Sequence, residues 1–285
     1  MKTIIVLIST VTALLAAGCG GGAASAGGGV VAGFYPLAFA AEEVAGQGTA
    51  VTNLTPAGAE PHDLELSVRN VETVASADLV LYLGGGFQPA LEDAVESTGT
   101  RAVDLLEGLE LRAGEDGDQA FDPHVWLDPV RFAQVAERIG AELGAGEAAA
   151  ELAARLLALD AEYEEGLAEC AERTLVTAHD AFGYLGDRYE LEVVPIAGIA
   201  PEAEPTPQDL ERVAELVRER GVSTVFVEPL VAPDVGETVA REVGADVAVL
   251  DPLEGLTGEQ LDRGDDYFTV MRANLAALVE GLGCR

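Results

Sequence analysis

Basic side chains are scarce in this chain of 285 residues. It has 16 Lys and Arg against 50 Asp and Glu, which gives a formal net charge of −34 at pH 7. A surface of this charge repels the phosphate groups of nucleic acids and of anionic lipids. We therefore exclude nucleic acid as a partner and disfavour direct docking to an anionic membrane surface. The same field concentrates cations near the protein, although acidity of this kind also serves solubility.

Aromatic residues and long apolar runs are also few. The chain has one Trp, six Tyr and eight Phe, which gives little support to an adhesin, whose contact surface is expected to expose aromatic side chains. Beyond the N-terminal segment, no apolar run reaches the length that spans a bilayer. The hydrophobic content of 49% still suffices for a large core, in one long domain or two medium ones.

The first 18 residues have the pattern of a lipoprotein signal peptide. Lys2 precedes an apolar run from Ile4 to Gly18, which is too short to span a bilayer, and small residues stand directly before Cys19. We expect cleavage before Cys19 and a lipid on its thiol; an ordinary secretory signal with an incidental cysteine is the alternative. Residues 19–29 then read as a flexible tether. We expect a protein that is anchored to a membrane and not threaded through it.

Cysteine is rare as well, with three in the chain. If Cys19 carries lipid, Cys170 and Cys284 remain as an even pair in an exported protein, where disulfides persist. We predict that these two are bonded. Two buried free thiols are the alternative, because the sequence does not show whether they lie close together.

Short strand-like runs alternate with helical patterns, which predicts an α/β fold. Strands are expected at 30–33, 50–54, 79–83, 175–178, 192–196, 224–227 and 246–250, and helices at 36–45, 68–76, 208–220, 234–242 and 267–280. Residues 147–172 contain no Pro and are rich in Ala, Leu and Glu, which predicts one long helix. We therefore expect an N-terminal lobe at 30–145, a rigid linking helix at 146–172 and a C-terminal lobe at 173–285, with only small rocking between the lobes.

The chain has only three histidines, and each follows a strand-like run or a turn. His62 and His124 belong to the first lobe, and His179 belongs to the second. Ligand sites of open α/β sheets lie at the carboxyl ends of strands. We expect the three imidazoles to meet in the cleft between the lobes, whereas the alternative is three unrelated histidines with local structural uses.

A carboxylate from the second lobe would complete such a site. Asp251 follows the strand expected at 246–250 and is our candidate for the fourth ligand. Three imidazoles and one carboxylate suit zinc, although copper and nickel would bind the same set. Carboxylates also lie near each histidine in the sequence and are candidates to orient the imidazoles: Asp63, Asp122 with Asp128, and Asp180.

Several motifs in order resemble the lipoprotein receptors that deliver zinc or manganese to ABC importers. They are Tyr35-Pro36-Leu37, Glu60-Pro61-His62-Asp63, Ala77-Asp78-Leu79-Val80, His124-Val125-Trp126-Leu127-Asp128-Pro129, His179-Asp180-Ala181-Phe182 and Leu250-Asp251-Pro252-Leu253. The resemblance extends from about Val30 to Gly281. It implies two lobes joined by a long backbone helix, with one metal held between them at His62, His124, His179 and Asp251. Glu60 or a water molecule could replace Asp251.

The resemblance implies a function as well as a fold. We expect an extracytoplasmic, lipid-anchored monomer that binds Zn(II) with high affinity and hands it to a membrane permease, without catalysis. His179 favours zinc, because manganese-type relatives tend to have a carboxylate there. A manganese receptor of the same family is one alternative. The other is a zinc hydrolase, in which water would take the fourth coordination position.

Overall fold

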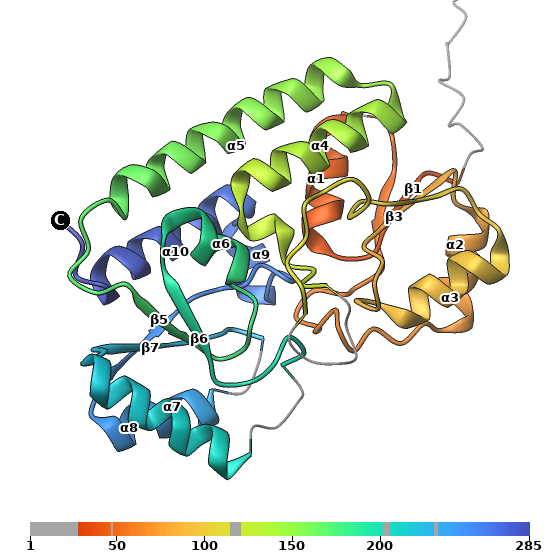
Figure 1. Cartoon of the computed structure of the whole chain (residues 1–285). Coiled ribbons are helices and arrows are strands. Elements are labelled where there is room, and N and C mark those ends of the chain that lie inside the picture. The colour runs from red at the N-terminus through yellow and green to blue at the C-terminus, as the bar shows by residue number, and fades with distance from the viewer. Residues whose placement is uncertain (1–27, 47, 115–120, 202–205, 231–232) are drawn as a thin grey trace, which may run out of the picture.

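The computed structural model describes residues 28–46, 48–114, 121–201, 206–230 and 233–285. The signal peptide expected at 1–18, Cys19 and most of the expected tether lie outside the described residues. Figure 1 shows two α/β lobes, with the N-terminal half on the right and the C-terminal half at the lower left. No helix within the described part is both long enough and apolar enough to cross a bilayer.

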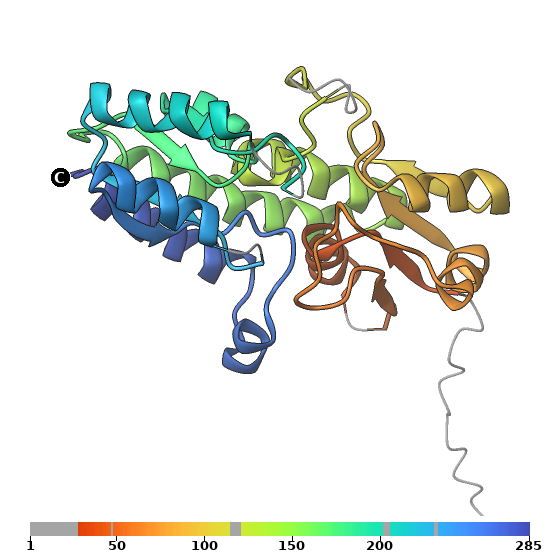
Figure 2. The same ribbon diagram turned by 90° about the horizontal axis from the view of Figure 1, so that it is seen from below.

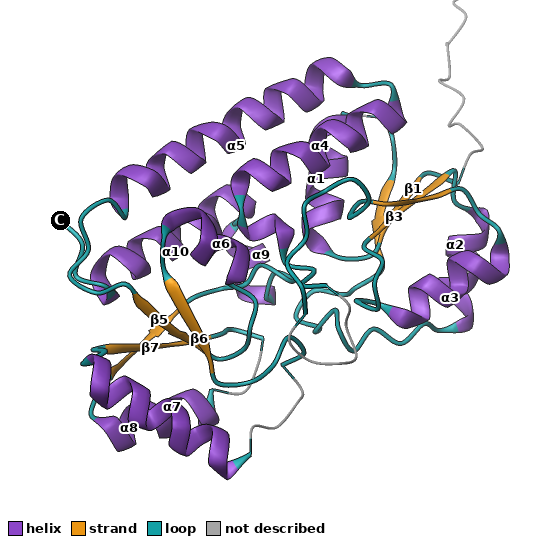
Figure 3. Ribbon diagram, viewed as in Figure 1, coloured by secondary structure: helices purple, strands orange, loops and turns teal. Residues whose placement is uncertain are grey.

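The N-terminal lobe is built on a parallel four-stranded sheet. Its strands are β1 (Val30–Ala32), β2 (Val51–Asn53), β3 (Leu79–Tyr82) and β4 (Ala102–Asp104), in the order β2-β1-β3-β4. The central strands β1 and β3 are uninterrupted apolar runs, as expected for strands that are covered on both faces. Helix α1 (Tyr35–Ala45) covers one face, and α2 (Val68–Ser76) and α3 (Pro89–Thr98) lie on the other (Figure 3).

The C-terminal lobe repeats this arrangement. Its strands are β5 (Thr174–Thr177), β6 (Glu192–Pro195), β7 (Thr224–Val227) and β8 (Asp246–Val249), all parallel, in the order β6-β5-β7-β8. Its helices are α6 (Gly183–Tyr189), α7 (Pro207–Arg220), α8 (Asp234–Val243), α9 (Gly258–Arg263) and α10 (Tyr267–Gly281). The expected fold class, two α/β lobes, is therefore confirmed.

The short 3₁₀ helix η1 (Val125–Leu127) is followed by two helices that pack against each other, α4 (Pro129–Leu143) and α5 (Gly146–Gly166). Figures 1 and 2 show α5 running along both lobes, and it contacts α1 and α4 at one end and α10 at the other. The helix expected to continue to residue 172 ends at Gly166. The residues after it pair with the C-terminal segment and do not continue the helix: the backbone N–H groups of Ala171 and Glu172 donate to the carbonyls of Gly283 and Leu282.

The predicted disulfide between Cys170 and Cys284 is present and joins residues 114 positions apart. It fixes the segment after α5 to the end of α10, so the last residues of the chain are held against the middle of the sequence. In the chain-entropy model, closing a loop of this length stabilises the folded state by up to about 5 kcal/mol.

The largest of three apolar clusters among the described residues contains side chains of both lobes. It includes Phe34 and Leu81 from the N-terminal sheet region, Leu156 from α5, and Phe226 and Leu250 from the C-terminal sheet region. Tyr163 of α5 donates a hydrogen bond to the carbonyl of Met271 in α10 at 2.6 Å, which ties α5 to the C-terminal lobe. A continuous packed interior resists large relative movements of the lobes.

Candidate metal centre

Parallel strands direct their carboxyl ends toward the same edge of a sheet, and both sheets present this edge to the space between the lobes. In the C-terminal sheet, the chain leaves β5 toward β6 on one side, while β7 lies on the other side. Ligands of open α/β sheets bind at such a switch in strand order. His179 follows β5 and Glu228 follows β7, so these two side chains flank the switch point.

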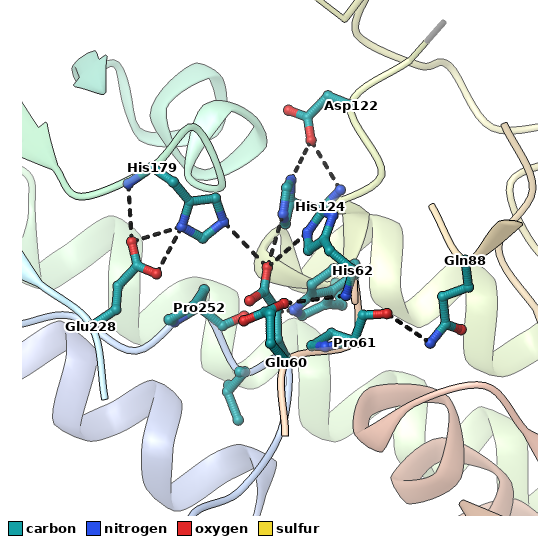
Figure 4. Close-up of polar contacts among 12 residues, drawn as sticks. Glu60, Pro61, His62, Gln88, Asp122, His124, His179, Glu228 and Pro252 are labelled. Atoms are coloured by element: carbon teal, nitrogen blue, oxygen red, sulfur yellow. Dashed lines mark hydrogen bonds and ion pairs between the residues drawn. The ribbon is translucent and has the colours of Figure 1, made fainter. Parts of the chain in front are cut away.

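His62 lies in the loop after β2, and the buried amide of Gln88 holds this loop in place. The Nε2 group of Gln88 lies within hydrogen-bonding distance of the Gly33 carbonyl (3.3 Å), the Thr55 hydroxyl (3.2 Å) and the Pro61 carbonyl (3.2 Å). Gly33 has no Cβ, and one built there would come within 2.3 Å of Oε1 of Gln88. The end of β1 and the residue before His62 are therefore tied to one side chain, as Figure 4 shows for Pro61 and Gln88.

His124 is fully buried directly before η1, and Asp122 orients it. Oδ1 of Asp122 accepts hydrogen bonds from the backbone N–H of His124 at 2.9 Å and from its Nδ1 at 2.8 Å. Glu228 does the same for His179, with 2.7 Å between Nδ1 and each carboxylate oxygen. Because a carboxylate only accepts, both rings carry a proton on Nδ1 and turn Nε2 toward the centre of the cluster.

The three Nε2 atoms converge on one carboxylate oxygen. Oε1 of Glu254 lies 3.3 Å from Nε2 of His62, 3.0 Å from that of His124 and 3.2 Å from that of His179. All four donor atoms lie within 4.8 Å of one another. Zinc with bonds of about 2.0 Å to four donors has donor-to-donor edges of about 3.3 Å, close to the three measured distances. Figure 4 shows the three imidazoles pointing toward one another from separate loops.

The charges of the cluster are strongly coupled. Burial alone would raise the pKa of Glu254, but the charge of His179 and the hydrogen bonds from the imidazoles hold it well below its usual range. Burial would likewise lower the pKa of His179, but Glu228 and Glu254 raise it well above its usual value. A buried imidazolium and the carboxylates around it therefore stabilise each other. A divalent cation would supply the same positive charge at the same place.

The structure brings the three predicted histidines together but does not bring Asp251 to them. Oδ1 of Asp251 accepts from the backbone N–H of Leu253 at 2.8 Å, and Oδ2 accepts from Nε2 of Gln260 at 2.7 Å. Glu254 lies in the position that we assigned to Asp251. The physical reason is local: Asp251 turns back onto its own loop, whereas Glu254 lies further along the loop and reaches the histidines.

Glu60, the alternative fourth ligand, is not one of the four clustered donors either. Its Oε1 accepts from the backbone N–H of His62 at 3.3 Å, and burial together with the charge of Glu254 raises its pKa to about 9. It lies beside the cluster as a carboxyl group that favours its protonated form. Figure 4 shows it close to His62 and Pro61.

Three of the four carboxylates that we expected to orient imidazoles do not do so. Asp63 is exposed, and Nδ1 of His179 is bonded to Glu228 and not to Asp180. Asp128 caps α4 by accepting from the backbone N–H groups of Val130 and Arg131. Only the expectation for Asp122 is matched. Glu228 was missed in the sequence. It directly follows β7, the neighbour of β5 in the sheet, and the same kind of position after a strand was the reason for choosing His179.

Comparison with known proteins gives a consistent match. The family model described as ZnuA, zinc-uptake complex component A, periplasmic, matches residues 30–281. The zinc-binding protein AdcA of Streptococcus pyogenes serotype M6 is 33% identical over 282 residues, which cover 87% of this chain and 55% of that protein. The high-affinity zinc uptake system protein ZnuA of Bacillus subtilis is 31% identical over 277 residues, which cover 89% of this chain and 87% of that protein.

Solved structures agree with the sequence comparison. The Zn(II)-bound ZnuA-like domain of Streptococcus pneumoniae AdcA superposes with a TM-score of 0.76 and 32% identity, covering 89% of this chain and 98% of that one. The chain spans about half the length of the AdcA relatives that it matches, 55% in the case given above. The similarity therefore extends over nearly all of the described fold but over one part of those longer proteins.

Proposed function

Because the chain belongs to the ZnuA family of periplasmic zinc-uptake components, we propose that it binds Zn(II) outside the cytoplasmic membrane and delivers it to the permease of an ABC importer. The observation that carries this proposal is the convergence of His62, His124, His179 and Glu254 on one point between the lobes. These donors come from the loop after β2, the segment before η1, the loop after β5 and the segment after β8. A bound ion would therefore contact both lobes.

The donor set favours zinc over manganese. Three imidazole nitrogens and one carboxylate oxygen are borderline donors that suit Zn(II), whereas Mn(II) prefers more oxygen ligands. Asp122 and Glu228 further favour a strongly bound ion, because they raise the basicity of the imidazoles that they orient. Copper and nickel would also bind in vitro, since intrinsic affinity follows the Irving–Williams order.

A fourth protein donor supports binding without catalysis. A hydrolytic zinc site keeps one coordination position for water, with a carboxylate base in reach. Here Oε1 of Glu254 is within 3.3 Å of all three Nε2 atoms, so a protein ligand takes the position that a hydrolase leaves to water. We therefore propose a receptor and not an enzyme.

The proposed location is outside the cytoplasm, at a membrane. The family description places its members in the periplasm, and a relative from Streptococcus pneumoniae is named a zinc-binding lipoprotein. We propose that Cys19 carries the lipid after removal of residues 1–18, and that a monomer with lobes at 30–145 and 173–285 docks on the permease. Metabolic labelling with a radioactive fatty acid tests the anchor, because Cys19→Ser should remove the label.

Metal competition tests the proposed function. Protein made without a His tag and stripped with a chelator is expected to bind one Zn(II) tightly and Mn(II) far more weakly. Isothermal titration with each ion, followed by competition for zinc with a chromogenic chelator, gives both affinities. Equal affinity for the two ions, or no zinc binding, would contradict the proposal.

Glu254→Gln is expected to weaken zinc binding roughly 100-fold, since it keeps the shape of the side chain but removes the negative charge next to the ion. Chelator competition measures the loss. Glu259→Gln, on the exposed first turn of α9, makes the same chemical change in the neighbouring helix and should leave the affinity unaltered. An unchanged affinity in Glu254→Gln would remove Glu254 from the ligand set.

A further inference from the structure

The segment Asp251–Glu254, which carries the fourth donor, is held by hydrogen bonds at each of its first three residues. Asn274 of α10 brackets Asp251: its Oδ1 accepts from the Asp251 N–H at 2.9 Å, and its Nδ2 donates to the Asp251 carbonyl at 2.7 Å. Trp126 of η1 donates from Nε1 to the carbonyl of Pro252 at 2.7 Å. The segment is thus fixed from both lobes before it reaches Glu254.

Leu253 has an unusual backbone conformation. Its φ is +56°, and the only other described non-glycine residue with positive φ is Glu190, at the C-cap of α6. A left-handed conformation is strained for a bulky residue and persists only where its surroundings impose it. Leu253 directly precedes Glu254, so its conformation sets the direction in which the chain enters Glu254. The direction of the Glu254 side chain therefore depends on what holds this turn.

The carboxylate of Asp251 holds the turn. Its Oδ1 accepts from the N–H of Leu253 at 2.8 Å, while Gln260 of α9 donates to Oδ2 at 2.7 Å. A cavity of about 330 Å³, lined by Asp251, Gln260, Asn274 and neighbouring residues of α9 and α10, lies on one side of this carboxylate. Asp251 itself is buried, and these two hydrogen bonds fix the position of its carboxylate.

We propose that Asp251 is a positioning residue for the metal centre: its carboxylate fixes the left-handed turn at Leu253 and so places the Glu254 carboxylate against the three imidazoles. This inference rests on the proposed zinc-binding function. Asp251 does not contact the ion in this account and acts only through Glu254. Without the Asp251 acceptor, the buried N–H of Leu253 loses its partner, and the turn relaxes toward an ordinary backbone conformation.

The test compares Asp251→Ala and Asp251→Asn by chelator competition for zinc. Loss of a group that orients a ligand typically weakens metal binding about 10- to 100-fold, and we expect this for Asp251→Ala. Asn keeps an oxygen acceptor for the Leu253 N–H, the bond that fixes the turn, and gives up only the bond from Gln260, whose Oε1 stays on the Thr257 N–H. Asp251→Asn should therefore stay within about threefold of the wild type.

Asp104 provides a matched control. Its Oδ1 accepts from the N–H of Leu106 at 3.0 Å, the same bond over the same spacing, at the end of β4 in the other lobe. Asp104→Ala removes that bond away from the four donors and should leave zinc affinity unaltered. Circular dichroism and gel filtration of each variant confirm that the measured molecules are folded.

A double-mutant cycle separates positioning from general structural loss. If Asp251 acts through Glu254, Asp251→Ala has no further effect on zinc affinity in a Glu254→Ala background. Co(II) offers a second readout, since the visible absorption of a four-coordinate site should change in the same way in Asp251→Ala and Glu254→Ala. An unchanged affinity in Asp251→Ala, or the same loss with and without Glu254, overturns the inference. Absence of zinc binding by the wild type overturns the proposed function instead.

Discussion

Replacing His124 with alanine is expected to weaken zinc binding about 10²- to 10³-fold. Zinc bound by four protein ligands gains about 10–16 kcal/mol, so one ligand accounts for about 2.5–4 kcal/mol on average. His124 is fully buried, and Asp122 orients it, so the loss should be at the upper end of this range. His62→Ala should behave similarly. Competition with a chelator of known affinity measures both changes.

A structural control is needed, because removing His124 also leaves Asp122 with one fewer partner inside the protein. All three histidines lie in the cluster, so the chain offers no histidine elsewhere for comparison. Asp160→Asn is a suitable substitute, since Asp160 is buried and bonded to Arg188 and Tyr189, apart from the four donors. It should lower stability without changing zinc affinity. Unchanged zinc binding in both histidine variants would refute the ligand assignment.

Removing the disulfide is expected to lower the free energy of unfolding by about 2–5 kcal/mol, because the unfolded chain regains the entropy of a loop of 114 residues. The variant Cys170→Ser with Cys284→Ser avoids free thiols. Denaturant unfolding must be followed in the presence of a chelator, since bound zinc would stabilise the folded state and mask the difference.

Zinc affinity separates this effect from a change in the metal centre. Cys170 and Cys284 join the end of α10 to the segment after α5, and neither residue contributes to the four clustered donors. The double variant should therefore bind zinc as the wild type does wherever it remains folded. A stability loss below about 0.5 kcal/mol would mean that the backbone pairing of residues 171–172 with 282–283 holds the terminus without the bridge.

The sequence allowed the lobes to be predicted because most strands are short apolar runs. The strand at Thr224–Val227 and the helix at Val68–Ser76 have the expected limits. The strand at Ala102–Asp104 was missed, since it is short and ends in a charged residue. The helix α4 was missed too, because Pro129 at its start reads as part of a turn, although Pro suits the first turn of a helix.

The site was predictable only in part. Three histidines at strand ends gave a clear signal, since parallel strands gather their carboxyl ends. The carboxylates gave none, because the chain has 50 Asp and Glu and sequence spacing does not tell which one turns inward. Asp251 stands closer to the end of β8 than Glu254 does. The left-handed turn at Leu253, which exchanges their roles, cannot be recognised from a leucine.

The gathering of every imidazole into one place has a practical use. When the protein is labelled with ¹⁵N at histidine side chains, each ring signal in a magnetic resonance spectrum originates from the cluster, with no background from the rest of the molecule. Such spectra would follow, ring by ring, which nitrogen holds a proton and which an ion as zinc enters and leaves.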